Sequence, residues 1–133
     1  MLERTHIQSS GFRNIGEPGA RSGFQVRLRQ PNYRATRLSL LAGIDIAVDG
    51  ETHASRHSRF LVAGREYMHD ELLSATEVRW EVGTFITVLI NRPGGLRPGV
   101  HSVSSVIAFR HPYFPPQFQP TFVRDSRMIT IIL

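Results

Sequence analysis

The chain has 133 residues with ordinary hydrophobic (41%) and charged (20%) fractions, so its length suits one domain, residues 1–133, with its own core. It has no cysteine, no apolar leader at its start and no apolar run near the ~20 residues of a membrane span, which argues against a disulfide scaffold or a membrane protein and favours the cytoplasm. The net charge of +5 comes from sixteen arginines and no lysine, scattered beside eleven acids, which is not the basic run of a nucleic-acid-binding arm.

Alternating apolar and polar residues predict a half-buried strand over residues 23–29 (GFQVRLR). Its apolar side chains would face a core, whereas Arg27 and Arg29 would lie on the opposite face. Arginine on such a face is usually solvated, but its planar guanidinium also suits ion pairs at protein interfaces. A turn with Tyr33 and Arg34 follows and extends this candidate contact surface.

A second alternating segment, residues 43–51 (GIDIAVDGE), predicts another half-buried strand. It ends in Asp49-Gly50, which supplies the residue types that a tight hairpin turn requires. We expect the returning strand near residues 59–64 (RFLVAG).

The second half of the chain contains further apolar segments. FITVLI (85–90) and VHSVSSVIAFR (100–110) flank a stretch rich in proline and glycine, and we expect these two strands to pair. MITIIL (128–133) is apolar on both faces and should lie deep in a sheet or beneath a partner. HDELLSA (69–75) suits a short helical turn capped by Asp70. Seven or eight strands with frequent turns predict an all-β fold, an antiparallel β-sandwich with one short helical turn.

The segment HPYFPPQFQP (111–120) must be a loop, because its four prolines lack backbone donors and have a fixed φ. Loops usually run over the surface, so Tyr113, Phe114 and Phe118 either fold back onto the core or contact another molecule. The adjacent prolines hold the chain extended and limit how far these aromatic rings can fold back. The composition therefore favours a partner contact.

The residues specify no catalytic or metal site. His53 and His57 have the i, i+4 spacing of two metal ligands, but they lie in a polar stretch without a helical pattern. Glu66 and His69 have Glu-x-x-His spacing but straddle the expected end of a strand and the start of a helix. The glycines within residues 94–99 suit turns rather than a phosphate-binding loop, and no serine lies in a nucleophile elbow.

Five segments, in order along nearly the whole chain, carry a family resemblance. They are GFRN (11–14), GFQVRLRQPNYR (23–34), LSLLAGIDIAVDGE (38–51), RW (79–80) and PGGLRPGVH (93–101). This collinear series, rather than any single motif, resembles the small β subunit of bacterial C-glycoside deglycosidases.

The resemblance implies a β-sandwich subunit in a hetero-oligomer with a larger TIM-barrel α subunit, which holds a divalent metal, expected to be manganese. The complex would be a lyase that cleaves the carbon–carbon bond between a 3-oxo sugar and an aromatic, flavonoid-type aglycone. The family's catalytic residues belong to the α subunit, so no catalytic residue, metal ligand or cofactor is expected on this chain. Its role would be to bind and stabilise the α subunit and to help wall the active site, with no nucleic acid or membrane as partner.

Arginine and aromatic side chains are the candidates for contact with the partner or the substrate. They are Arg27, Arg29, Tyr33, Arg34, Tyr113, Phe114 and Phe118. Trp80 is predicted to belong to the core, where large aromatic residues usually lie. An alternative is a stand-alone carbohydrate-binding β-sandwich in which Tyr113, Phe114 or Trp80 stacks on sugar rings. The net charge alone suggests a third option, a nucleic-acid module whose binding would depend steeply on salt.

Overall fold

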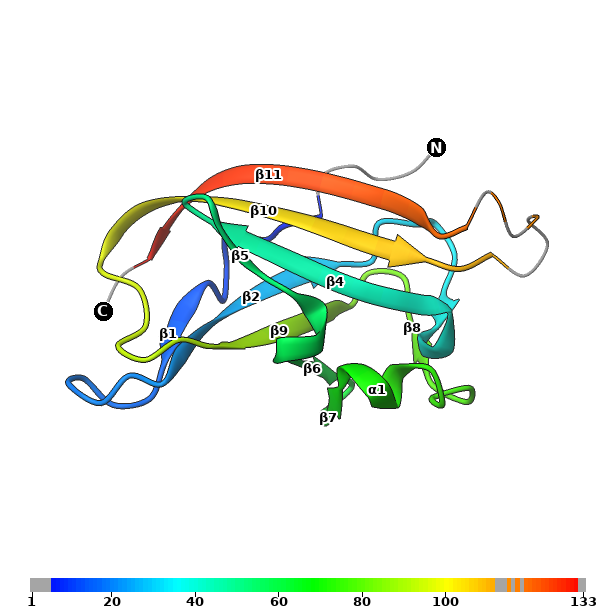
Figure 1. The fold of residues 1–133 in the computed structure, drawn as a ribbon, viewed down its shortest axis with the longest axis horizontal. Helices are drawn as coiled ribbons and strands as arrows, with labels where there is room; N and C mark the ends of the chain where they lie inside the picture. The colour runs from blue at the N-terminus through cyan, green and yellow to red at the C-terminus, as the bar shows by residue number, and fades with distance from the viewer. Residues whose placement is uncertain (1–5, 112–114, 116, 118, 132–133) are drawn as a thin grey trace.

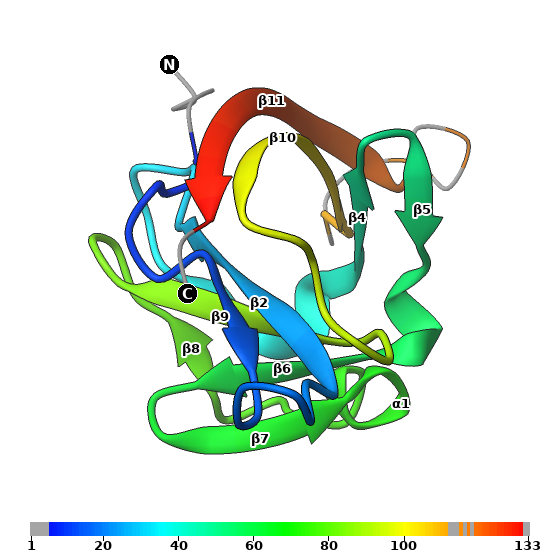
Figure 2. The same cartoon turned by 90° about the vertical axis from the view of Figure 1, so that its left-hand side faces the viewer.

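A computed structural model describes residues 6–111, 115, 117 and 119–131, and it confirms the all-β sandwich (Figures 1 and 2). The five-stranded sheet has the order β1-β2-β9-β6-β7, the four-stranded sheet has the order β11-β10-β4-β5, and β3 pairs with β8. The strands are β1 (Arg13–Ile15), β2 (Gly23–Arg29), β3 (Thr36–Arg37), β4 (Leu41–Val48), β5 (Glu51–His53), β6 (Ser58–Val62), β7 (Arg65–Met68), β8 (Arg79–Trp80), β9 (Phe85–Asn91), β10 (Gly99–Phe109) and β11 (Thr121–Ile131). The expected seven or eight strands were too few, because five of the strands in the described residues have only two to four residues.

The core lies between the inner faces of the two larger sheets. The alternation predicted in β2 is confirmed, since Phe24, Val26 and Leu28 are fully buried while the less buried Arg27 and Arg29 point away from the core. Branched and aromatic residues of β9, next to β2 in the same sheet, and of β4 and β10 in the facing sheet fill the rest of the core, as expected for two packed pleated sheets.

The turn at Asp49-Gly50 is confirmed, and both residues have the positive φ (50° and 86°) that a tight hairpin requires. However, the strand that returns along β4 is β5, so the expectation for residues 59–64 was wrong. A 3-10 turn (Ser55–His57) carries the chain across to the other sheet, where β6 pairs with β9 and β7. The hairpin residues therefore predicted the turn but not the length of the strand after it.

The predicted pairing of residues 85–90 with residues 100–110 was also wrong. β9 lies between β2 and β6 in one sheet, whereas β10 lies between β4 and β11 in the other. The proline and glycine segment between them is a crossover between sheets, and Gly94 and Gly95 have the positive φ (84° and 64°) of turn residues. Each strand is central in its own sheet, so both of its edges are paired with neighbouring strands.

The C-terminal strand alternates and lies at a sheet edge, so the expectation that it lies deep in a sheet was wrong, whereas cover by a partner stays a prediction. Ile129 and Ile131 are buried, whereas Met128 is 64% exposed, because β11 lies at the edge of its sheet and directs one face to the core. Ile132 and Leu133 lie outside the described residues.

The predicted helical turn is confirmed as α1 (His69–Leu72), beside β7 (Figure 1). It begins before Asp70, which therefore is not the N-cap; the Met68 N–H instead donates to the Glu71 carboxylate at 2.8 Å. Among the described residues, none of the helices has the length and apolar composition needed to cross a membrane.

The N-terminal residues 6–8, which we call the N-terminal latch, join the two larger sheets along one edge. The Asp125 carboxylate of β11 accepts hydrogen bonds from the backbone N–H groups of His6 (3.0 Å) and Ile7 (2.9 Å). On the other side of the latch, the Arg29 N–H of β2 donates to the His6 carbonyl at 2.8 Å. One carboxylate thus connects the four-stranded sheet to a segment that is paired with the five-stranded sheet.

The His6 side chain is fully buried beneath this connection. Its Nε2 is hydrogen-bonded to the Ser105 hydroxyl, and its Nδ1 is buried with no hydrogen-bond partner among the described residues. Burial lowers the pKa of His6, and the charge of Asp125 opposes this effect only in part. The folded protein therefore holds His6 in its neutral form.

We predict that the free energy of unfolding falls as the pH drops below about 6.5, the ordinary pKa of histidine in the unfolded chain. In that range the unfolded chain takes up a proton that folded His6 excludes, and the loss continues down to the lowered folded pKa. Denaturant titrations at a series of pH values would measure the slope. His6→Gln should flatten it, whereas His57→Gln, at an exposed position, should leave it unchanged. Equal slopes for wild type and His6→Gln would contradict the prediction.

Candidate functional site

The predicted contact residues within the described part of the chain lie on two surfaces. Arg27 and Arg29 lie on the outer face of the five-stranded sheet, where the Arg27 guanidinium is 6.0 Å from the centre of the Phe85 ring. Tyr33 (68% exposed) and Arg34 lie in the loop between β2 and β3, at one end of the sandwich. Three further predicted contact residues lie outside the described residues, and their role stays a prediction: Tyr113, Phe114 and Phe118.

The flanks of the proline-rich segment are fixed to each other by side-chain hydrogen bonds. The His111 N–H donates to the Gln119 side-chain carbonyl at 3.1 Å, and the Gln119 amide donates to the His111 carbonyl at 2.6 Å. His111 Nε2 also lies 2.7 Å from the Thr121 hydroxyl. These bonds continue the β10–β11 ladder beyond its last backbone pair.

A hollow of about 640 Å³ lies at the same end of the sandwich, lined by residues of β3, β8 and the end of β10. We call it the arginine hollow, because three arginines contribute to its lining. Its polar lining includes Asn32, Thr36, Arg37, Arg79, Arg110 and His111. It therefore connects the loop that carries Tyr33 with the start of the proline-rich segment.

Short local structure brings the arginines together. The two-residue strands β3 and β8 place Arg37 directly opposite Arg79, and both side chains are exposed. Arg110 follows β10, and its guanidinium donates to the Ser39 carbonyl at 3.1 Å. Within the described residues, none of these three arginines forms an ion pair with an acidic side chain. The hollow is thus positively charged and suited to a carboxylate or phosphate, which a guanidinium can bind through two parallel hydrogen bonds.

Sequence reasoning missed Arg37, Arg79 and Arg110 as members of one site. The first two are far apart in the chain and meet through a ladder too short to show any alternation. The RW pair at residues 79–80, which contributes to the family resemblance, is a sequence signal that points to this position.

Trp80 lies in the core next to the hollow, as predicted, with 1% of its surface exposed. Its ring stacks on Phe109 at a centroid distance of 6.4 Å and an angle of 21°, and its ring N–H donates to the Thr84 carbonyl at 3.2 Å. The buried Gln30 amide donates to the Trp80 carbonyl at 2.9 Å. The alternative in which Trp80 stacks on a sugar is therefore wrong for this residue.

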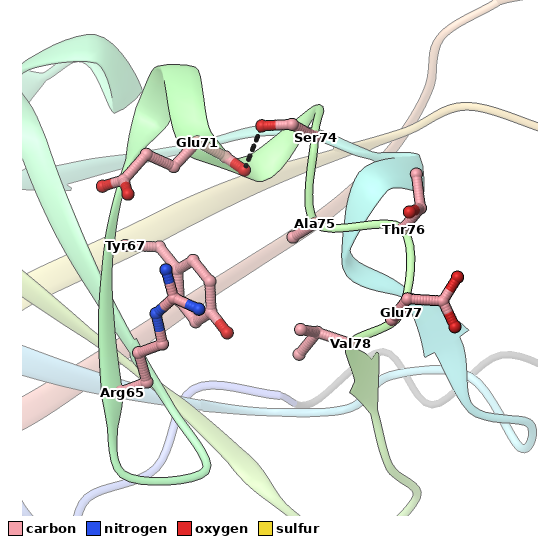
Figure 3. A pocket seen from close by; sticks show the side chains of 8 residues that line it. All are labelled: Arg65, Tyr67, Glu71, Ser74, Ala75, Thr76, Glu77 and Val78. Atoms are coloured by element: carbon pink, nitrogen blue, oxygen red, sulfur yellow. Dashed lines mark hydrogen bonds between the residues drawn. The ribbon is translucent and has the colours of Figure 1, made fainter.

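A smaller hollow of about 250 Å³ lies beside α1 (Figure 3). The Arg65 guanidinium lies over the Tyr67 ring, 4.8 Å from its centre, and occupies the face on which a sugar would stack. The carboxylates of Glu71 and Glu77 lie on opposite sides of the hollow in Figure 3. This hollow has a mixed charge and does not offer an open aromatic platform.

The histidines and acids with ligand-like spacing do not converge. His53 and His57, in β5 and the following turn, have different partners. Glu66 forms an ion pair between β6 and β7, whereas His69 Nδ1 lies 2.7 Å from the Ser55 hydroxyl. No group of three or more histidine, aspartate or glutamate side chains within the described residues is placed to hold a metal ion.

A buried histidine fastens the β4–β5 turn to β10. His101 Nδ1 lies 2.6 Å from the Asp49 carboxylate, and its Nε2 lies 2.7 Å from the Arg97 carbonyl. The hydrogen bond with His101, followed by that from the Ser102 N–H, lowers the pKa of Asp49. This carboxylate therefore stays ionised well into the acid range and serves the fold.

Comparisons with known proteins give a consistent result. A model of the family described as C-glycoside deglycosidase beta subunit matches residues 2–113. The chain is 31% identical to a "C-glycoside deglycosidase beta subunit" of Eubacterium cellulosolvens, over 89% of this chain and 81% of that protein. It is 33% identical to a "3'-dehydrocarminate deglycosidase beta subunit" of a Microbacterium species, over 79% of each chain.

We predict that Trp80→Ala lowers the free energy of unfolding by about 3–5 kcal/mol, because it removes a buried ring and leaves a cavity beside Phe109. Tyr33→Ala, a truncation at a position 68% exposed, should change it by less than about 0.5 kcal/mol. Urea denaturation of both variants would measure the two values. A Trp80→Ala chain as stable as wild type would contradict a core role.

Proposed function

The chain belongs to the C-glycoside deglycosidase beta subunit family, and from this membership we propose that it is the non-catalytic subunit of a two-component lyase. Its partner is a larger TIM-barrel α subunit that holds a divalent metal, manganese in our proposal. The complex cleaves the carbon–carbon bond between a 3-oxo sugar and an aromatic, flavonoid-type aglycone. The family match over residues 2–113 is the observation that carries this proposal.

The reaction needs groups that can all reside on the α subunit. A 3-oxo group acidifies the proton on C2 of the sugar, and a base removes that proton as the aglycone leaves by elimination. Polarisation of the 3-oxo oxygen is the chemistry that a divalent metal supplies. The Microbacterium relative is named for a 3'-dehydro compound, and we extend a 3-oxo substrate to this chain.

Two buried histidines form hydrogen bonds within the fold, which supports a structural role for them. His6 is bonded to Ser105, and His101 bridges Asp49 and the Arg97 carbonyl, so both rings hold the sandwich together. The names of the two relatives identify them as beta subunits, which supports assembly with a second chain.

We propose that the end of the sandwich with the arginine hollow faces the α subunit. The exposed Tyr33 and the arginines give this end the composition of an interface, where aromatic residues and arginine are enriched. The active site of a TIM barrel opens at one face, and a subunit placed over that face supplies a wall for a flat aglycone and excludes water. The cytoplasm, with its reducing conditions, is the compartment that we propose for the complex.

We predict that the purified chain alone does not turn over a 3-oxo-C-glycoside, even with added manganese, and that activity appears when the α subunit is added. Co-expression with a tagged α subunit should recover both chains, and a chelator should abolish activity while this chain stays folded. Turnover by the isolated chain at the rate of the complex would refute the proposal. The failure of the two chains to co-purify would also refute it.

A further inference from the structure

The arginine hollow has two like charges at paired positions of a strand ladder, an arrangement that the fold does not need. Arg37 and Arg79 lie directly opposite each other on β3 and β8, an arrangement that is destabilising for equal charges. The neighbouring Trp80 holds β8 in place through buried contacts, whereas both arginine side chains are exposed. Two neutral side chains would preserve the ladder without the repulsion.

The third arginine adds a preorganised positive charge to the same hollow. The guanidinium of Arg110 is held by the Ser39 carbonyl at 3.1 Å, which restricts its side chain but does not neutralise it. The Asn32 amide donates to the Gln30 side-chain carbonyl at 3.1 Å, and buried Gln30 is bonded to the Trp80 carbonyl, so the opposite wall is also fixed. Arg110 and the Asn32 wall are therefore set before any ligand arrives, which lowers the entropic cost of binding.

We propose that the arginine hollow is the docking site for acidic side chains of the α subunit. This inference rests on the proposed function and names the surface and the chemistry through which the two subunits recognise each other. A carboxylate placed between Arg37 and Arg79 removes their repulsion and forms charge-assisted hydrogen bonds with both. The exposed Tyr33 in the adjoining loop adds apolar contact at the rim.

Two other anionic ligands fit the observations less well. A small anionic ligand is usually enclosed over most of its surface, whereas Arg37 and Arg79 are exposed on an open wall. A nucleic acid requires a track of cations that follows successive phosphates, whereas here three arginines converge on one hollow. A protein surface with a few carboxylates matches both the size and the charge.

The test compares Arg37→Gln, Arg79→Gln and the double variant with wild type in titrations against the purified α subunit. Arg13→Gln is the matched control, because it removes the same charge from an exposed position on β1, away from the arginine hollow (Figure 1). We expect each hollow variant to weaken assembly at least tenfold and to reduce its dependence on salt concentration, with no change for the control. The melting temperature of the isolated hollow variants should be unchanged or higher, because a repulsion has been removed.

The possible results separate the two proposals. If wild type does not bind the α subunit at all, the proposed function fails; if wild type binds and the double variant binds equally well, the docking inference fails alone. A double variant that assembles normally but has a raised KM for a carboxylated aglycone would overturn the inference in favour of a substrate contact. Oligonucleotide binding by wild type that is lost in the double variant would overturn it in favour of nucleic acid. A lowered melting temperature of the isolated variants would assign the arginines to the fold instead.

Discussion

The Asp125 carboxylate of β11 ties the two larger sheets together along one edge, in addition to the apolar core between them. Asp125 accepts the backbone N–H groups of His6 and Ile7, and the same short segment pairs with β2 on its other side. Without this connection, the part of β2 that pairs with the latch would present unpaired backbone groups to solvent or to other chains. The connection brings His6 into the core, where its imidazole is bonded to Ser105 and stays neutral. The stability of the sandwich is thereby tied to the protonation of one buried ring.

Other histidines also form hydrogen bonds that join distant elements of the fold. His101 and Asp49 hold the β4–β5 turn against β10, while Ser55 and His69 tie the turn before β6 to α1. Histidine can act as base, ligand or structural bond, and in each of these places it serves as a bond between elements that are distant in sequence. The arginines lie mostly on the surface, where their charge is available to another molecule. This division agrees with a subunit that contributes surface rather than reacting groups.

The sequence predicted those parts of the fold that arise from local patterns. Alternation identified β2, and the residue types at Asp49-Gly50 identified the turn, because both depend on neighbours in the chain. Pairing between strands is decided by distant contacts, so the expected partnership of residues 85–90 with residues 100–110 failed although both strands exist. The arginine hollow was missed for the same reason, since its members come from separate short elements. Tyr33 and Arg34 were predicted because an exposed turn is visible in the sequence; they lie in the loop that borders the hollow, and their contact role stays a prediction.

The β10–β11 hairpin is built so that the segment at its tip can change in length without disturbing the strands. Its two strands are paired over eleven residues each without a break in register, and the bonds between His111 and Gln119 extend the ladder into the two ends of the proline-rich segment. Because these two residues are bonded to each other, an insertion or deletion between them alters neither the register of the strands nor the core. Each doubling of a loop's length costs only about 0.6 kcal/mol of closure entropy. A change of length between His111 and Gln119 should therefore leave the sandwich intact.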